Sequence, residues 1–153
     1  MNARDIMNVQ VVTLEPGMLV PDIARIFSKR GISGAPVMEN GEVIGIVTQL
    51  DLIARHARPH YPAYLPLLDA RIPLGGQREY LEVVRRILAM TARDVMTTPA
   101  QSVDVEADLE DVATLMVEEK VNPVPVLEHG KLVGIISEAD LIRHLEEAQP
   151  LPS

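Results

Sequence analysis

The chain has 153 residues, of which 47% are hydrophobic, and its formal net charge at pH 7 is −8. This hydrophobic content excludes a disordered chain, and the acidic balance argues against nucleic-acid binding, which needs a basic surface. The sequence has no cysteine, which excludes disulfides and thiolate sites, and it shows neither a signal sequence nor an apolar stretch of about 18 residues, so we expect a soluble, cytoplasmic protein without membrane contact.

The first 56 residues predict one β-α-β-β-α unit. Residues 9–14 form a short extended run, and apolar residues recur at helical spacing over residues 20–27. Residues 35–48 predict a β-hairpin, because an Asn-Gly pair stands between two apolar runs and both turn residues tolerate a positive φ. A second helix is expected from Gln49 onwards.

Residues 57–91 predict a connecting segment of a different kind. Four prolines and a Gly-Gly pair between residues 59 and 76 favour an extended connection. Residues 77–91 predict a helix, because apolar residues recur there at helical spacing. Since this helix face and residues 64–68 are too apolar to stay in solvent, we expect the segment to pack against the rest of the protein.

Residues 92–147 repeat the first unit. The tripeptide Ala-Arg-Asp occurs at residues 3–5 and again at residues 92–94, an offset of 89 (92 − 3) that also aligns the hairpins and the phrases GIVTQLD and GIISEAD. Repetition of this length indicates two related units, each too small to bury a good core alone, so the two should pack on each other. We therefore expect units at residues 1–56 and 92–147, the connecting segment between them, and a tail at residues 148–153.

The repeated pattern resembles a known family. Each unit begins with Arg-Asp-(Ile/Val)-Met, carries Pro-Val before its hairpin, and ends with Gly-Ile-(Val/Ile)-(Thr/Ser)-x-x-Asp-Leu-Ile. This resembles a tandem pair of CBS domains, known as a Bateman module. The resemblance implies an α/β (α+β) fold in which two pseudo-symmetric β-α-β-β-α units pack sheet to sheet, with the connecting segment and its helix inserted between them.

The phrase that ends each unit has two interpretations. As a structural feature, Thr48 and Ser137 are N-caps of the following helices, and Asp51 and Asp140 complete capping boxes. As a binding feature, the same residues place free amides, a hydroxyl and a carboxylate at a helix N-terminus, which suits an anionic or polar ligand. The residues alone leave both interpretations open.

The resemblance implies the binding interpretation in more detail. The phrase is similar to a motif of CBS pairs that contacts adenosyl ligands, so Asp51 and Asp140 would hold ribose, and Thr48 and Ser137 would meet the 5′ substituent. The possible ligands are AMP, ADP, ATP and S-adenosylmethionine, and no cofactor is required. The residues that would shape the two adenine pockets are Ile32, Ser33, Gly34 and Pro36 in the first unit and Val121, Asn122, Pro123 and Pro125 in the second.

Charge distinguishes the two expected clefts. The chain departs from nucleotide-binding members, because no basic residue stands inside the phrases, where Gln49 and Glu138 lie, or in the loop before each Pro-Val pair. Residues 92–145 carry 4 basic and 11 acidic groups, a net charge of −7, whereas Arg30 and Arg55 lie near the first phrase in sequence. We therefore expect the first cleft to prefer anionic nucleotides and the second to prefer S-adenosylmethionine.

Other chemistry has little support in the sequence. The four histidines form no recognisable metal motif and no serine lies in a nucleophile elbow, so we expect neither a metal site nor catalytic residues. The leading hypothesis is a stand-alone regulatory module that acts through an unknown effector protein. The alternative is a ligand-free dimerisation or interaction scaffold. We expect a homodimer, because the helices that follow the two phrases carry more apolar residues than a solvent-exposed face needs.

Overall fold

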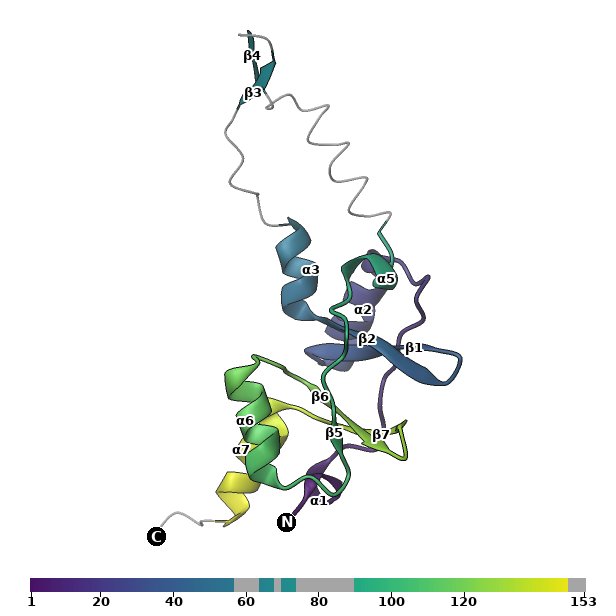
Figure 1. Ribbon diagram of the computed structural model, residues 1–153, viewed down its shortest axis with the longest axis vertical. Helices are drawn as coiled ribbons and strands as arrows, with labels where there is room; N and C mark the ends of the chain where they lie inside the picture. The colour runs from purple at the N-terminus through teal and green to yellow at the C-terminus, as the bar shows by residue number, and fades with distance from the viewer. Residues whose placement is uncertain (57–63, 68–69, 74–89, 149–153) are drawn as a thin grey trace.

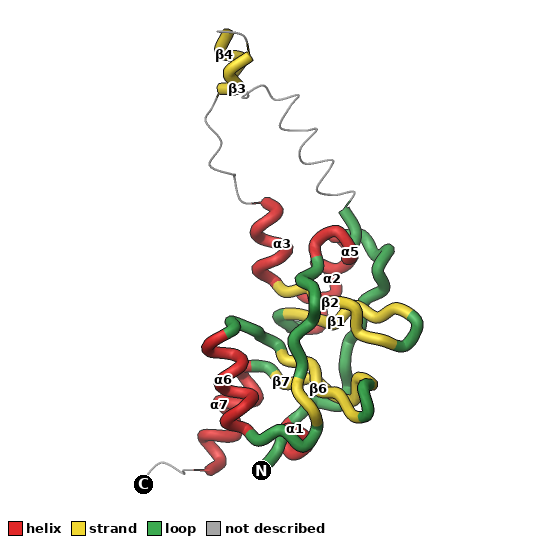
Figure 2. The backbone as a smooth tube through the Cα atoms, viewed as in Figure 1, coloured by secondary structure: helices red, strands yellow, loops and turns green. Residues whose placement is uncertain are grey.

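The computed structural model describes residues 1–56, 64–67, 70–73 and 90–148 of the chain. Two β-hairpins with their helices lie one above the other (Figure 1). Figure 2 shows that both hairpins turn back on one side of the molecule, while the helices that follow the hairpins lie on the opposite side. The α+β fold of two repeated units, expected from the sequence, is confirmed.

The helices and strands follow the order of the repeat. The first repeat contains α1 (Ala3–Ile6), α2 (Val20–Arg30), β1 (Gly34–Glu39), β2 (Glu42–Thr48) and α3 (Gln49–His56). The second contains α5 (Ala92–Val95), β5 (Val103–Asp104), α6 (Leu109–Glu118), β6 (Val124–Glu128), β7 (Lys131–Ile136) and α7 (Glu138–Ala148).

The connecting segment includes a strand pair that the sequence did not predict. Strands β3 (Tyr64–Leu67) and β4 (Ala70–Pro73) pair antiparallel, where we expected only an extended connection. A proline stands in each of these strands, and proline normally argues against a strand because it cannot donate to the ladder. Almost all of the helix expected over residues 77–91, and the expected packing of the segment, lie outside the described residues.

Helix α2 shows why the predicted helices form. Pro21 stands in its first turn, where no intrahelical hydrogen bond is lost, and Gly31 ends the helix in the left-handed conformation with a φ of 64°. Its buried residues, Val20, Ile23 and Phe27, belong to the core of the first repeat. This is the apolar face that the helical spacing of the sequence predicts.

Both hairpins turn as predicted. The φ angles are 53° and 79° at Asn40 and Gly41, and 52° and 76° at His129 and Gly130. Two successive residues with positive φ make the tight turn whose twist matches that of antiparallel strands. Each hairpin also has one register irregularity at the equivalent place, between residues 37 and 38 and between residues 126 and 127.

The short segments that begin the two repeats are exchanged in space. Ala3 of α1 is fully buried in the core of the second repeat, and Ala92 of α5 is fully buried in the core of the first. The protein therefore consists of an upper lobe, residues 14–56 with 90–97, and a lower lobe, residues 1–8 with 103–148 (Figure 1). The sequence predicted two units packed on each other but did not predict this exchange.

Matching contacts in both lobes fix the exchanged segments. One residue pair with two backbone hydrogen bonds joins each segment to the last strand of a hairpin, and an ion pair joins it to the first strand. Glu128 raises the pKa of Arg4 by accepting a hydrogen bond from its guanidinium. The backbone pairs are Asn8 with Ile135 and Thr97 with Ile46, and the ion pairs are Arg4 with Glu128 and Arg93 with Glu39.

Candidate functional site

The first repeated phrase lies where β2 is followed directly by α3. Thr48 is the last residue of the strand, and the helix begins at the next residue. Thr48 N donates to Asp51 Oδ2 at 2.9 Å, and Asp51 N donates to Thr48 Oγ1 at 3.2 Å. These reciprocal bonds form a capping box, which pairs amides that a helix N-terminus otherwise leaves without partners.

The second phrase has the same geometry at the start of α7. Ser137 N donates to Asp140 Oδ2 at 2.8 Å, and Asp140 N donates to Ser137 Oγ at 3.3 Å. The Ser137 hydroxyl also donates to Asp140 Oδ2, at 3.0 Å. The capping-box interpretation is therefore confirmed in both copies. It does not exclude a ligand, because each carboxylate keeps a second oxygen that its cap does not use.

The two carboxylates differ in what contacts this second oxygen. Asp51 Oδ1 accepts a hydrogen bond of 3.2 Å from Thr97 Oγ1, which belongs to the exchanged segment. Asp140 Oδ1 instead lies 3.4 Å from Arg143 Nη1, and the Asp140 side chain is only 17% exposed. Sequence reasoning missed both partners. The sequence does contain a signal for Arg143, because residues three positions apart lie on the same face of a helix. It contains none for Thr97, which only the tertiary structure brings to α3.

The residues before each hairpin support the helix N-termini. Ser33 O accepts a hydrogen bond of 2.8 Å from Gln49 N, the first amide of α3. Asn122 Oδ1 accepts one of 3.0 Å from Glu138 N, the first amide of α7. These bonds occupy amides that an anion could otherwise contact. A phosphate group therefore has fewer free donors at these helix ends than the sequence suggests.

The other expected pocket residues lie in the cores or between the lobes. Pro36 and Pro125 are fully buried, and Ile32 and Val121 are partly buried against the two cores. Gly34 and Pro123, which occupy equivalent positions of the repeat, face each other across the boundary between the lobes. A Cβ atom added to Gly34 would stand 2.6 Å from Pro123 Cδ. The structure thus brings the two expected pocket segments together at the boundary between the lobes.

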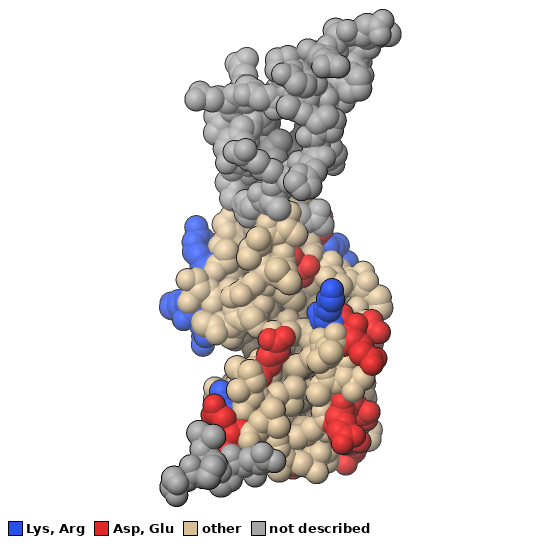
Figure 3. Space-filling model, turned by 90° about the vertical axis from the view of Figure 1, so that its left-hand side faces the viewer, with Lys and Arg blue, Asp and Glu red and all other residues tan. Residues whose placement is uncertain are grey.

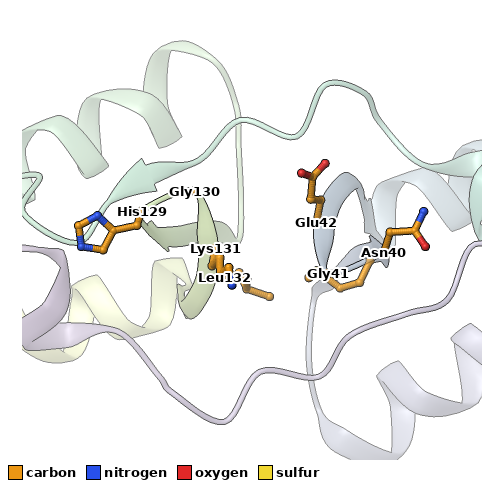
Figure 4. Close-up of a pocket in the computed structure, with 8 residues that line it drawn as sticks. Asn40, Gly41, Glu42, His129, Gly130, Lys131 and Leu132 are labelled. Atoms are coloured by element: carbon orange, nitrogen blue, oxygen red, sulfur yellow. The ribbon is translucent and has the colours of Figure 1, made fainter.

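Two hollows lie on the surface of the described part of the chain. One, of about 250 Å³, lies beside the second phrase and is lined by Asp140 and Arg143 together with Asp5 of α1. The other, of about 510 Å³, lies between the turns of the two hairpins and contains no residue of either phrase (Figure 4). The face seen in Figure 3 is also hollowed between the upper and lower lobes.

Charged groups gather beside the second phrase. His144 and Glu147 of α7 line the smaller hollow with the two aspartates and the arginine. Within the described residues, no group of three or more histidine, aspartate or glutamate side chains is placed to hold a metal ion. Among the same described residues, no helix has the length and apolarity needed to span a membrane.

The capping geometry makes a prediction about stability. Thr48→Ala and Ser137→Ala should each lower the free energy of unfolding by about 0.5–2 kcal/mol. Each substitution removes the hydroxyl that accepts a hydrogen bond from the backbone amide of Asp51 or Asp140. Urea denaturation measures this change. Ser28→Ala, at an exposed position of α2, is the control and should change stability by less than about 0.5 kcal/mol. Equal effects of all three substitutions would contradict a capping role for the hydroxyls.

Comparison with known proteins supports the repeat. The family model for the CBS domain matches twice, at residues 3–58 and 92–147. The uncharacterized protein MJ1426 of Methanocaldococcus jannaschii is 30% identical, over 93% of this chain and 89% of that protein.

Solved structures show the same fold at lower identity. CBSX2 of Arabidopsis thaliana in complex with AMP has a TM-score of 0.71 and 22% identity, over 96% of this chain and 97% of that chain. The CBS domain pair of MJ0100, in complex with 5′-methylthioadenosine and S-adenosyl-L-methionine, has a TM-score of 0.73 and 19% identity, over 97% and 98% of the two chains.

Proposed function

The chain belongs to the CBS domain family, and from this premise we propose that it is a regulatory CBS pair that binds an adenosyl ligand between its lobes. The observation that carries the proposal is the pair of capped carboxylates, Asp51 and Asp140, at the N-termini of α3 and α7. Each offers an acceptor oxygen beside a hydroxyl at a helix N-terminus. This is the chemistry that ribose hydroxyls and a polar 5′ group need.

Two structural relatives support the class of ligand. AMP in one, and methylthioadenosine and S-adenosylmethionine in the other, share an adenosyl group. We therefore propose AMP, ADP, ATP or S-adenosylmethionine as candidate ligands. The sequence predicts that the second cleft prefers S-adenosylmethionine because this unit is strongly acidic. Arg143 lies beside Asp140 and neutralises part of this negative charge. That preference and the anionic preference of the first cleft stay predictions.

Isothermal titration calorimetry tests the proposal most directly. The protein is titrated with adenosine, AMP, ADP, ATP and S-adenosylmethionine, and with guanosine monophosphate as the matched control. We expect saturable binding of at least one adenosyl compound and no comparable binding of the guanosine compound. Absence of saturable binding to all adenosyl compounds at millimolar concentration would refute the proposed function.

One observation favours the alternative of a ligand-free scaffold. Both capping boxes are complete within the chain, so the repeated phrases have a structural role without any ligand. Under this alternative the two lobes form a fixed platform for other proteins. The calorimetric panel separates the two functions, because a scaffold binds none of the compounds.

We propose that the signal passes to an effector protein through a homodimer. Helices α3 and α7 expose large apolar side chains: Leu50 is 75% exposed, Ile53 60%, Ile142 57% and Leu145 66%. Apolar residues that cluster on the last helix of each repeat suit a self-complementary interface. The effector protein, like the cytoplasmic location expected from composition, stays a prediction.

The dimer proposal predicts the effect of a charge on these helices. Ile53→Glu and Ile142→Glu, at equivalent positions of the repeat, should shift the mass measured by light scattering at micromolar concentration from dimer to monomer, because a carboxylate cannot be buried there unpaired. Val117→Glu on α6, where the side chain is 76% exposed, is the control and should leave the mass unchanged. A monomer mass for the unmodified protein would contradict the dimer.

A further inference from the structure

The two lobes meet at a contact that lies on the axis of the repeat. Gly34 and Pro123 occupy equivalent positions, and a Cβ at Gly34 would stand 2.6 Å from Pro123 Cδ and 3.1 Å from Val47 O. Strands β2 and β7, which are also equivalent, contact each other across the same boundary. Residues at equivalent positions can face each other only near a pseudo-twofold axis. The contact is apolar and non-directional.

The far ends of the two hairpins are separated. Gly34 stands at the start of β1, whereas the hollow of about 510 Å³ lies at the turns and is lined by residues of both hairpins. Figure 4 shows the turns facing each other across this gap, which we call the tip gap. The hairpins therefore contact each other at one end and diverge at the other. We call the Gly34–Pro123 contact the pivot and the two hairpins the arms.

Opposite charges stand at equivalent positions of the tip gap. Glu42 and Lys131, related by the repeat, both line it and both are exposed. Figure 4 shows that Asn40 and His129 point away from the gap. The structure gives these two side chains no ion pair with each other, although both are described. An unpaired glutamate and lysine on opposing arms are positioned to attract each other as the gap narrows.

Each hairpin is fixed to its own lobe and moves with it. The ion pairs of Arg93 with Glu39 and of Arg4 with Glu128 hold the strand before each turn. A rotation of one lobe against the other at the Gly34–Pro123 contact is therefore transmitted to the tips.

The repeated phrases lie on the other side of this pivot. Helices α3 and α7 extend from the hairpins on the side opposite the turns, where the surface between the lobes is hollowed (Figures 1 and 3). We propose that the hairpin tips form a latch, in which a ligand between the lobes on that side pushes the helices apart, narrows the tip gap and pairs Glu42 with Lys131. The inference rests on the proposed function and specifies its regulation.

Thermodynamic linkage gives the size of the expected effect. If the closed latch favours the liganded arrangement, then the ion pair contributes to ligand affinity although it never touches the ligand. An exposed ion pair contributes little, so its loss should weaken the apparent affinity by about twofold to fivefold. The effect should disappear at high salt, because the interaction is between exposed charges.

A charge-exchange cycle tests the latch. Glu42→Lys and Lys131→Glu each place like charges at the tips, and each should weaken binding of the adenosyl compound identified by calorimetry about twofold to fivefold at low salt. The double exchange restores opposite charges and should restore affinity. Glu110→Lys and Lys29→Glu, at exposed helix positions that do not line the gap, are the controls with the same changes in net charge. A double variant as weak as the single variants would overturn the latch.

A cross-link provides a second readout. Because the chain has no cysteine, Glu42→Cys with Lys131→Cys introduces its only thiol pair, and a disulfide forms only when the two Cβ atoms approach to about 3.8 Å. We expect faster cross-linking with ligand present and at least twofold tighter binding to the oxidised form than to the reduced form. Slower cross-linking with ligand would overturn the latch alone. Absence of binding to the unmodified protein would overturn the proposed function and the latch with it.

Discussion

Replacing Gly34 by alanine should lower the free energy of unfolding by about 1–3 kcal/mol, the range for overpacking a well-filled contact. The added Cβ would stand 2.6 Å from Pro123 Cδ and 3.1 Å from the carbonyl oxygen of Val47. Neither neighbour is the far end of a flexible side chain, because one is a ring atom and the other is backbone. The lobes must therefore shift to accept the methyl group.

Urea denaturation of Gly34→Ala measures this effect, and Gly17→Ala is its matched control. Nothing lies within 4 Å of a Cβ added at Gly17. This control should be neutral or stabilising by up to about 1 kcal/mol, because alanine reduces the entropy of the unfolded chain. If the two variants are equally stable, the contact between the lobes is not as close as the structure has it.

Replacing Asp51 or Asp140 by asparagine should weaken adenosyl-ligand binding tenfold to a hundredfold, while stability changes by well under about 1 kcal/mol. A hydrogen bond to a charged acceptor contributes about 1.5–3 kcal/mol, and losing this free energy raises Kd about tenfold to a hundredfold. The cap survives, because asparagine still offers an oxygen to the amides of Thr48 or Ser137. Calorimetry follows affinity, and thermal denaturation with and without ligand follows stability.

Asp22→Asn, on the exposed surface of α2, is the control for removing one carboxylate and should leave affinity unchanged. The two site variants should also differ from each other. Asp51 is hydrogen-bonded to Thr97 and Asp140 is paired with Arg143, so each substitution disturbs a different partner. Unchanged ligand-induced shifts of the thermal midpoint in both variants would remove the ribose role and favour the ligand-free scaffold.

Much of the fold can be read from local patterns. The Asn-Gly and His-Gly turns, the helical spacing in α2 and α6, and the hydroxyl and aspartate of both capping boxes depend on residues a few positions apart. The physical preferences involved act over one turn of helix or one hairpin, so the sequence alone expresses them. The strand pair β3–β4 departs from such patterns, because its prolines conceal the pairing.

Only the tertiary structure decided how the repeats combine. The segments that begin the repeats share Ala-Arg-Asp followed by a similar apolar residue and methionine, so nothing in them specifies the lobe on which each packs. Ala3 is buried in the core of the second repeat and Ala92 in the core of the first, so each segment packs on the other repeat. This exchange brings Thr97 to Asp51. The sequence by itself determined two similar units with capped helices. Long-range packing, which local preferences do not encode, determined the exchanged segments, the Gly34–Pro123 contact and the tip gap.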